Sequence, residues 1–587
     1  MKNLIRAFTF FFLSGVNGLY AQCALIEIPL IDRVRAATLI IEGRVIAKNS
    51  FWDGKHEKIY TSNRIEIFKI FKGNSTSAFI EVVTVGGVLK NEMMNVSNLL
   101  TLNKEDAGIF MLRPSSATEF TKLFVENSFE AVASLQGFIK YNPVTLDASD
   151  AFNLYNVENE LYEKLSIKGD YTLVKAFNLS EIKENAGNNT LSVPVILEIN
   201  PQKITAGTKS LLTIKGSGFG NTRGNGNVGF RNADDGGASL IFPLSHQYIK
   251  WQDNEIVVVV PENAGTGKVV VEKEISAESD DTLIISFSRI NVTSDEVAYL
   301  QYMVGKNSTG GYIWQMSELF DLNQLASAGF KRAFNTWRCN TGINWFIGDV
   351  TDIGVATKDE VNIIRFDIGE ELPEGVLGVT YSHYSSCQDE IWYLNEIDMV
   401  FDNEINWQYG PELPRIIQYD FESVALHELG HAHQLGHVLD PNDIMHYSYI
   451  RGTFNRVLNA ENLAGGNLIM QESTQRSVCE FSPMEAISES ICGIPELTNF
   501  TFQGLLFFPN PVSTQFSIQY KIAEVSSVNI ELFNSLGQKV HTVVNEKQPV
   551  GIYNRSLNIE ELNISKGIYF LRLYLNDEKF TYKLIKM

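Results

Sequence analysis

A histidine-rich stretch in the last third of the chain places the strongest constraint on its fold. Residues 427–437 read HELGHAHQLGH, so this short segment holds four of the chain's nine histidines. On an α-helix, His427 and His431 would project from one face about one turn apart, as two ligands of a single ion require. His437 lies too far along a straight helix to share that face. The spacing therefore predicts a helix, then a turn, with three imidazoles converging on one metal ion.

Glu428 stands beside the first of these histidines. A carboxylate there is near the metal without being forced into the ligand set, so it can take a proton from a metal-activated water and pass it to a departing amine. With Met445 eight residues after His437, the pattern resembles the metzincin motif HExxHxxGxxH followed by a methionine turn, and more narrowly the matrixin branch. The resemblance implies an α+β catalytic domain with zinc endopeptidase activity.

The resemblance also assigns a role to each matching residue. The ligands of the one catalytic zinc that it implies are His427, His431 and His437. Glu428 would be the general base, and Met445 would form the hydrophobic floor beneath the metal. Tyr447 resembles the tyrosine that astacin-like and serralysin-like metzincins use as an extra ligand or oxyanion donor, so we predict it as a second catalytic residue. The sequence leaves open whether calcium is needed.

The chain departs from the family pattern at one position, where Gln434 stands in place of a glycine. A non-glycine residue in a left-handed turn costs about 1 kcal/mol. That cost is small enough for His437 to remain the predicted third ligand. Asp440 and Glu461 are the competing ligands, because a thermolysin-like site takes a downstream carboxylate.

The length of 587 residues predicts about four folded units at roughly 150 residues each. Residues 24–140 alternate apolar and polar residues and predict a β-rich domain, a small barrel or sandwich. Residues 141–192 read as a partly helical connector, and residues 193–290 again as an all-β domain. Residues 291–480 form the α+β domain that contains the histidines. Within these domains, helices are expected at 330–337 and 424–435. Strands are expected at 38–45, 64–71, 79–85, 195–199, 210–215, 269–272, 362–366 and 398–401.

Two further segments resemble known families. Residues 204–220 (ITAGTKSLLTIKGSGFG), with NVGF at 227–230 and AGTGKVVV at 264–271, resemble the IPT/TIG immunoglobulin-like family, which implies a sandwich used for spacing or binding. After a linker at 481–506, residues 507–587 contain FFPNPVSTQFSIQYKI and SKGIYFLRLYL and resemble the C-terminal sorting domain of Bacteroidetes cargo of the type IX secretion system. This second resemblance implies a small β-sandwich that the secretion machinery reads. The alternative is an ordinary adhesive sandwich.

The N-terminus reads as a signal peptide over residues 1–21. Lys2 and Arg6 precede a short apolar run, which small and polar residues interrupt before it is long enough to span a bilayer. No later segment is apolar enough to span one. We therefore expect an exported protein, acting outside the cell or at its surface, without a membrane span after signal removal.

Export to an oxidising compartment would allow disulfides among the five cysteines. Four cysteines allow three pairings, among which the sequence cannot choose. One reading pairs Cys339 with Cys387 and Cys479 with Cys492, and leaves Cys23 as the odd residue.

Charge excludes one class of partner. The formal net charge is -21 at pH 7, which repels phosphate backbones, so nucleic acid is not an expected partner. The leading hypothesis is a secreted zinc endopeptidase that hydrolyses protein or peptide substrates. The alternative is a non-catalytic surface adhesin in which the metal is structural. Three histidines leave one position for water, whereas a structural zinc site is closed by four protein ligands, so the sequence favours catalysis.

Overall fold

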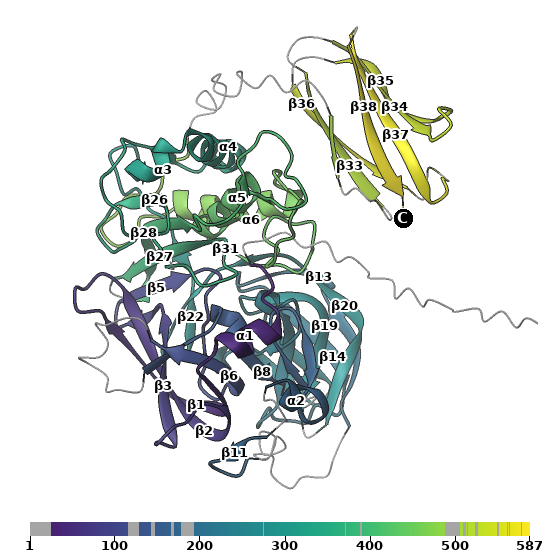
Figure 1. Cartoon of the computed structure of the whole chain (residues 1–587). Coiled ribbons are helices and arrows are strands. Elements are labelled where there is room, and N and C mark those ends of the chain that lie inside the picture. The colour runs from purple at the N-terminus through teal and green to yellow at the C-terminus, as the bar shows by residue number, and fades with distance from the viewer. Residues whose placement is uncertain are drawn as a thin grey trace, which may run out of the picture. The chain divides into compact units, whose positions relative to one another are not determined.

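The computed structural model (Figure 1) divides into two units, Met1–Cys492 and Gly493–Met587, and each is described by itself. The residues that it describes are 25–115, 128–142, 147–165, 170–177, 193–273, 275–369, 371–387, 390–487, 505–508, 512, 515–522, 526–548, 551–559, 562, 564–576 and 578–586. The expected signal peptide, Cys23 and Cys492 lie outside the described residues.

The N-terminal region is built on one sheet that closes on itself. Its strand order is β1-β2-β3-β7-β6-β8-β9-β10, and β1 also pairs with β6. The bounds are α1 (Leu30–Ala36), β1 (Leu39–Trp52), β2 (Ile59–Lys72), β3 (Phe79–Val85), β6 (Ala107–Pro114), β7 (Ser128–Ala131), β8 (Phe138–Tyr141), β9 (Asp147–Ser149), β10 (Leu154–Asn156), α2 (Tyr162–Leu165) and β11 (Thr172–Leu173). The last strands fall in the segment read as a connector, so this sheet continues past residue 140.

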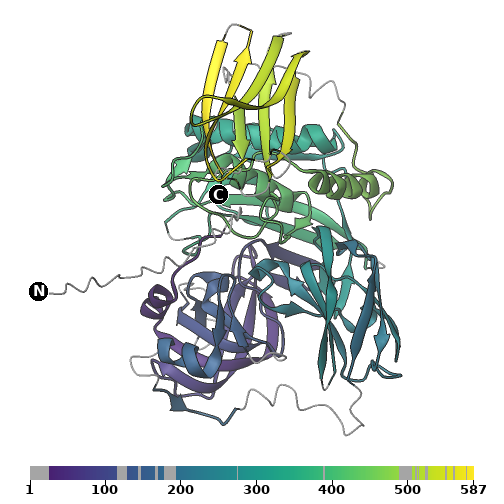
Figure 2. The ribbon, with the colours of Figure 1, turned by 90° about the vertical axis from the view of Figure 1, so that its right-hand side faces the viewer.

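The second all-β region contains two sheets that share a core of buried aliphatic residues. One sheet has the order β12-β14-β18-β17, and the other has the order β13-β20-β19-β15-β16. The bounds are β12 (Val195–Asn200), β13 (Lys203–Ala206), β14 (Leu211–Ser217), β15 (Asn227–Asn232), β16 (Leu240–Ile241), β17 (Tyr248–Gln252), β18 (Glu255–Val259), β19 (Ala264–Glu272) and β20 (Ser276–Arg289). Figure 2 shows these strands in teal.

The third region holds the histidines and an eight-stranded sheet of order β25-β24-β26-β28-β27-β5-β4, with β23 paired to β28. Strands β23 to β26 and β28 run parallel, whereas β27 is antiparallel to β28. The bounds are β4 (Gly87–Leu89), β5 (Glu92–Val96), β23 (Gln301–Tyr302), β24 (Tyr312–Met316), β25 (Trp345–Ile347), β26 (Asn362–Phe366), β27 (Gly378–Ser386) and β28 (Trp392–Phe401). Strands β4 and β5 come from the N-terminal region, so two regions distant in sequence share this sheet (Figure 1).

Four helices accompany this sheet: α3 (Glu318–Leu322), α4 (Gln324–Thr341), α5 (Phe421–Ala432) and α6 (Ala460–Thr474). All residues of α5 are buried, although five of its twelve residues are polar or charged. The indole of Trp337 on α4 donates a hydrogen bond of 2.8 Å to the carbonyl of Leu426 on α5. This contact joins the two helices along their buried faces. Short paired strands complete the region: β21 (Val292–Ser294), β22 (Val297–Tyr299), β29 (Trp407–Gln408), β30 (Tyr419–Asp420) and β31 (Leu435–Gly436).

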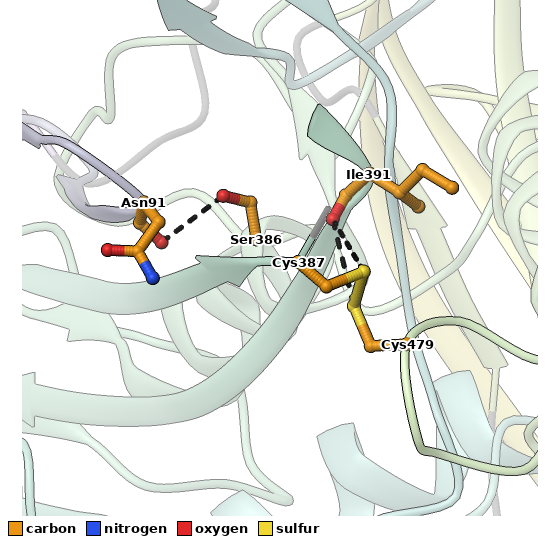
Figure 3. The surroundings of a disulfide bond; sticks show 5 residues. All are labelled: Asn91, Ser386, Cys387, Ile391 and Cys479. Carbon is orange, nitrogen blue, oxygen red and sulfur yellow. Dashed lines mark hydrogen bonds between the residues drawn. A yellow bond between two sulfur atoms is a disulfide. The ribbon is translucent and has the colours of Figure 1, made fainter. Parts of the chain in front are cut away.

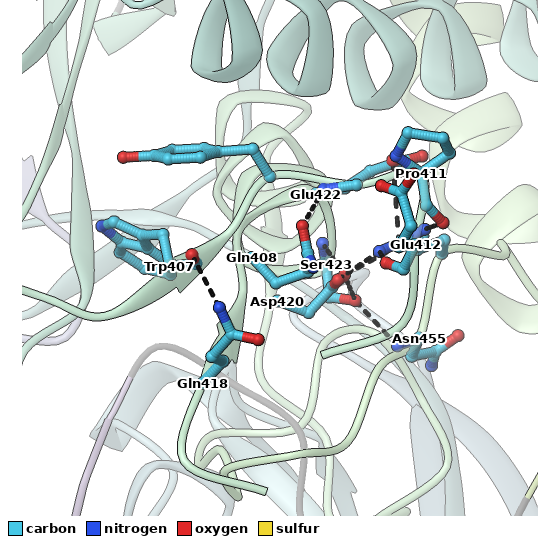
Figure 4. A network of polar contacts seen from close by, with 12 residues as sticks. Trp407, Gln408, Pro411, Glu412, Gln418, Asp420, Glu422, Ser423 and Asn455 are labelled. Atoms are coloured by element: carbon cyan, nitrogen blue, oxygen red, sulfur yellow. Dashed lines mark hydrogen bonds and ion pairs between the residues drawn. The ribbon is translucent and has the colours of Figure 1, made fainter. Parts of the chain in front are cut away.

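A polar network fixes the start of α5 (Figure 4). Asp420 caps the helix, because its carboxylate accepts bonds of 3.0 Å from the backbone N–H of Ser423 and 2.6 Å from the Ser423 hydroxyl. Arg456 pairs with Asp420, and Arg332 pairs with Glu422 at 2.7 Å. The two buried carboxylates are thus matched by two guanidinium groups, which fix where the helix with the histidines begins.

The disulfide differs from the expected pairing. Cys387 is bonded to Cys479, with 5.7 Å between their Cα atoms (Figure 3), and Cys339 is disulfide-bonded as well. The expected pairings of Cys339 with Cys387 and of Cys479 with Cys492 were therefore both wrong. The reason is that the end of β27 meets the segment after α6, a long-range contact that cysteine spacing does not encode.

The C-terminal unit has two antiparallel sheets around a core that includes Ile530, Leu532 and Leu571. The strand orders are β32-β33-β36 and β35-β34-β37-β38. The bounds are β32 (Leu505–Phe508), β33 (Gln515–Ile522), β34 (Ser526–Asn534), β35 (Lys539–Gln548), β36 (Gly551–Asn558), β37 (Gly567–Leu575) and β38 (Glu578–Lys586). Among the described residues, no helix combines the length and apolar character needed to cross a membrane.

Candidate metal centre and active site

Three histidines converge at the end of α5. Potential ligand atoms of His427, His431 and His437 all lie within 4.8 Å of one another, and all three side chains are buried. The ring centroids of His427 and His431 are 4.5 Å apart, and the ring of His437 lies 5.4 Å and 4.8 Å from them. The structure therefore brings together the three ligands that the sequence predicts.

The Nδ1 atom of each ring is held by an oxygen. His427 Nδ1 lies 2.7 Å from the carbonyl of Ile444, and His431 Nδ1 lies 2.9 Å from the carbonyl of Leu435. A carbonyl oxygen only accepts, so Nδ1 carries the hydrogen in both rings and Nε2 keeps its lone pair. His437 Nδ1 lies 2.7 Å from Oδ1 of Asp234, which imposes the same tautomer.

These rings suit a divalent metal. Nε2 of His431 and Nε2 of His437 are buried without a hydrogen-bond partner. Burial lowers the pKa values of His427 and His431 well below the usual value, so their imidazoles are neutral, as metal ligands must be. Neutral imidazoles with Nδ1 held by oxygen and Nε2 turned inward are the donor set that zinc prefers.

The chain turns between the second and third histidines at Gln434, which has φ 70°. This confirms the left-handed turn expected there. The turn is secured from outside, since β31 pairs with β20 of the second all-β region, with Gly436 opposite Ser288. His437, the predicted third ligand, thus follows directly after a strand that another region holds in place.

The buried side chain of Gln434 explains how a non-glycine residue is accommodated. Its Oε1 accepts bonds from the hydroxyl of Tyr384 at 2.7 Å and from Nε2 of Gln301 at 3.0 Å, and its Nε2 donates to the carbonyl of Ala432 at 3.1 Å. A glycine would relieve the backbone but would make none of these bonds. The side-chain bonds offset the strain of about 1 kcal/mol.

Met445 lies against the helix that carries His427 and His431. An ideal Cβ built on Gly430 would lie only 2.2 Å from Sδ of Met445, so the glycine creates the space that the methionine fills. The turn itself is held by Asp443, which accepts a bond of 2.7 Å from the backbone N–H of Met445. Val438, one residue after the third ligand, donates its N–H to the carbonyl of Met445 at 3.0 Å. Met445 thus connects the helix with the segment of the third ligand.

Glu428 is fully buried, and both oxygens of its carboxylate are hydrogen-bonded. Oε2 accepts bonds from the hydroxyls of Thr380 at 2.7 Å and Ser97 at 3.0 Å, and Oε1 accepts a bond of 2.9 Å from Nδ2 of Asn98. Burial raises the pKa of Glu428 to about 7, although these bonds oppose the rise. A carboxyl with such a pKa can both accept and release a proton near neutral pH.

Tyr447 lies at the edge of this region. A Cβ on Gly236 would lie 2.4 Å from its hydroxyl oxygen, and its ring centroid is 6.0 Å from that of Phe152. Its pKa is raised to about 12 by burial. These contacts place Tyr447 against the two all-β regions, and its catalytic role stays a prediction.

The competing ligands and the fourth histidine point elsewhere. Glu461 forms an ion pair of 3.0 Å with Lys203, and Asp440 accepts a bond from the N–H of Asn442 at 2.9 Å. His433 stands two residues after His431, about 200° around a helix, so it points away from the other imidazoles, and it is buried against Trp337.

Sequence reasoning missed four residues that hold the site: Ser97, Asn98, Asp234 and Thr380. Asp234 stands 203 residues before His437, and Asn98 stands 330 residues before Glu428. None of them belongs to a local pattern that would have marked it. A cavity of about 630 Å³ adjoins the site and is lined by residues of all three regions, among them Ser97, Asp234, His431 and His437.

Two family models match segments of the chain. Residues 316–465 match the family model described as Matrixin, and residues 506–587 match the one described as Secretion system C-terminal sorting domain. Comparison with curated proteins finds no match. One similar solved structure is a structural genomics protein of unknown function from Bacteroides thetaiotaomicron, at 12% identity and a TM-score of 0.16, over 22% of this chain and 32% of that chain. The chain thus contains a matrixin domain, the mark of a metallopeptidase, and a type IX sorting domain that indicates export to the cell surface or the extracellular space.

Proposed function

We propose that the protein is a zinc-dependent endopeptidase that acts outside the cell on protein or peptide substrates. The observation that carries the proposal is the convergence of three buried imidazoles beside a buried carboxylate, inside the matched matrixin segment. The residues that would hold zinc are His427, His431 and His437. Zinc, when bound, supplies a Lewis acid that polarises a peptide carbonyl and makes a water molecule more acidic.

The chain's own residues then move and hold the proton. Glu428 takes the proton of the attacking water on its carboxylate and passes it to the amine that leaves. Thr380 keeps this carboxylate in place through its hydroxyl. Asp234 orients the ring of His437 through Nδ1, and Met445 supports the helix from below. Tyr447 remains a candidate for holding the developing oxyanion, and calcium remains unassigned.

The alternative, a non-catalytic adhesin with a structural metal, has less support. A structural zinc site is closed by four protein ligands, whereas the cluster found among the described residues has three. The neighbouring carboxylate of Glu428 has no purpose in a purely structural site. The all-β region at 193–290 fits a spacing or binding role of the IPT/TIG type, which we propose as an addition to the activity.

Substitution of Glu428 tests the proposal. Glu428→Ala should keep zinc bound, because none of the three imidazoles is altered, but should abolish casein hydrolysis. The matched control is Glu461→Ala, which removes an acidic side chain of the same type from an ion pair with Lys203, away from the site. Zinc content is measured by mass spectrometry and turnover by release of labelled peptides. Unchanged turnover in Glu428→Ala would reject the proposed mechanism.

A further inference from the structure

The histidine site adjoins a polar cavity between the three regions of the first unit. The cavity has a volume of about 630 Å³, and His431 and His437 are part of its lining. The Nε2 atoms of both histidines are buried and have no hydrogen-bond partner among the described residues. A cavity of this size can hold a small ligand or a short stretch of peptide. A peptide that reaches the metal site therefore meets the side chains that line this cavity.

Carboxyl groups gather where the second all-β region meets the histidines. Asp234 and Asp235 follow β15, and Glu262 lies in the turn between β18 and β19. All three residues line the cavity. Since Asp234 Oδ1 lies 2.7 Å from Nδ1 of His437, this group of acids begins one imidazole away from the place of the metal ion.

The three acids are engaged in different ways. Asp234 is committed to His437, whose ring it orients. Asp235 accepts bonds of 3.2 Å and 3.1 Å from the backbone N–H of Ser239, and Glu262 accepts a bond from the backbone N–H of Asn291. These main-chain donors carry no charge. Asp235 and Glu262 therefore keep their capacity to attract a cation.

Two lysines line the same cavity, and both interact with Asp106. Lys140 pairs with Asp106 at 2.7 Å. Burial lowers the pKa of Lys48, and the negative charge of Asp106 opposes this change. Lys140 also acts on Asp235: burial raises the pKa of Asp235 to about 6, and the bonds from Ser239 and the charge of Lys140 oppose the rise. Asp235 thus has one lysine in reach, which it shares with Asp106.

Glu262 has no such cation. Burial raises its pKa to about 8, the bond from Asn291 opposes the rise, and the negative charge of Asp234 adds to it. In the part of the chain that the structure describes, no positive charge acts on this carboxyl. An ionised carboxylate that is withdrawn from water is costly unless a cation is paired with it. A cation that a ligand brings into the cavity would therefore be held most strongly beside Glu262.

We propose that Asp235 and Glu262 select substrates that carry a cationic group close to the bond that is cut. This inference rests on the proposed peptidase function and names the substrate class of the same site. The cationic group is an ammonium or a guanidinium, because these groups donate hydrogen bonds to carboxylate oxygens and carry the matching charge. Inside the cavity the attraction is stronger than in bulk water, since the effective dielectric constant is lower.

The cation has two possible sources in a peptide. One is the side chain of a lysine or an arginine, and the other is the free N-terminal amine. Both sources offer the same chemistry to Asp235 and Glu262, so the experiment contains an arm for each.

The rival explanation is that the two acids serve only the turns in which they lie. Asp235 would then be needed only to hold Ser239, and Glu262 only to hold Asn291. Asp235→Asn and Glu262→Gln separate the two explanations. Each amide keeps an oxygen that can accept the main-chain bond, but it removes the negative charge. A purely structural role predicts that substrate preference does not change.

Peptide binding to an inactive full chain tests the inference without any turnover. The chain is Glu428→Ala loaded with zinc, and the probes are labelled peptides in which a single lysine occupies each position in turn, with norleucine at the same position as the uncharged match. All probes are acetylated at the N-terminus. At one or more positions, lysine should bind roughly tenfold more tightly than norleucine. Adding Asp235→Asn and Glu262→Gln to this chain should abolish the preference.

Two comparisons complete the binding experiment. Asp280→Asn, which changes an exposed carboxyl of the same all-β region, should keep the preference. Norleucine peptides with a free N-terminus test the second source, because they should bind roughly tenfold more tightly than the acetylated peptides if the amine is the bound cation.

Equal binding of lysine and norleucine peptides at every position, with no effect of acetylation, would overturn the inference. A preference for cations that survives both amide substitutions would also overturn it, because the charge of Asp235 and Glu262 would then not be its cause.

Turnover separates a failure of this inference from a failure of the peptidase function. In the wild type, the same preference should appear in kcat/KM, and mainly through KM, because the two carboxyls hold the bound peptide before the reaction as well as during it. Cleavage of lysine and norleucine peptides with equal efficiency would overturn the inference and leave the peptidase function intact. A wild type that binds these peptides but cleaves none of them would instead reject the peptidase function, while the binding results still decide the preference for cations.

Discussion

The two histidines on α5 and the third histidine are held in different ways. His427 and His431 are oriented by main-chain carbonyls of Ile444 and Leu435, within their own domain. His437 is oriented by a side-chain carboxylate, Asp234, from the second all-β region. Two of the predicted ligands therefore depend on the local fold of the matrixin domain, whereas the third depends on a contact with another region.

The comparison shows that a chain can contain the whole histidine motif and still depend on another region to orient one of the three imidazoles. A main-chain carbonyl cannot be removed by substitution, so the first two rings keep their orientation as long as the helix and the methionine turn persist. The orientation of the third ring can be removed by one side-chain change. Predictions that separate these two halves of the site follow, beginning with the largest expected effect.

Gly430→Ala should disturb α5, which carries His427 and His431, the two histidines that are oriented within their own domain. The new Cβ would lie 2.2 Å from Sδ of Met445 and 3.3 Å from the indole of Trp337, so the methionine must move. Overpacking of this kind should destabilise the domain by roughly 2–3 kcal/mol, seen as a lower thermal midpoint. Gly354→Ala, where the Cβ would meet nothing within 4 Å, is the control. Equal midpoints would show that Met445 does not brace α5.

Asp234→Asn should affect only the third ligand. Loss of a carboxylate that orients a ligating histidine lowers metal affinity by about 10–100-fold. Competition with a chelator measures this affinity, and Asp280→Asn, an exposed carboxyl in the same all-β region, is the control. If zinc affinity is unchanged in Asp234→Asn, the third ring is held without help from the other region, and the distinction between the halves fails.

Glu262 lies in the second all-β region, close to where the chain enters the matrixin domain. Glu262→Gln should make the stability of the folded chain less dependent on pH. Burial raises the pKa of Glu262 from 4.5 to about 8, so the folded chain keeps a proton that the unfolded chain releases. Stability is therefore lost as pH rises from about 4.5 to about 8. The amide removes this loss and should stabilise the protein by roughly 1–2 kcal/mol at pH 8, with little effect at pH 4.

The measurement is the thermal midpoint of wild type and variant at both pH values. Glu296→Gln, at an exposed glutamate, should show no such difference. A variant that is no more stable than wild type at pH 8 would contradict the protonated state of Glu262.

Changes at Gln434 test the turn that separates the two histidines on α5 from His437. Gln434→Gly relieves the left-handed backbone but leaves the hydroxyl of Tyr384 without its acceptor, for a net loss of about 1 kcal/mol. Gln434→Ala loses the bonds and keeps the strain, so it should be less stable than the glycine variant by about 1 kcal/mol. Thermal midpoints that rank alanine above glycine would show that the backbone strain is unimportant here.

Parts of the fold could be predicted because their signals are local. The strand runs at 79–85 and 362–366 coincide with β3 and β26, and the spacing of His427 and His431 predicted their helix. The turn at Gln434 followed from the need to bring His437 back to the other rings. In each case, the period of the backbone or the length of a short segment determined the answer.

Other parts had no local signal. The disulfide between Cys387 and Cys479 joins residues 92 apart, and β4 and β5 join a sheet whose other members lie more than two hundred residues later. The extension of the N-terminal sheet past residue 140 involves strands of only three residues. Such contacts depend on which surfaces fit together after each region has folded.

The sequence by itself predicted the three histidines as ligands, the neighbouring carboxylate and the sorting domain at the C-terminus, because each prediction rests on residues that are close along the chain. Only the tertiary structure decided what surrounds them: Asp234 behind the third imidazole, and Ser97 and Asn98 on the carboxylate of Glu428. The physical reason is the distance along the chain over which each kind of interaction acts. Helical spacing acts over a few residues, whereas these contacts form between surfaces that only folding brings within hydrogen-bonding distance.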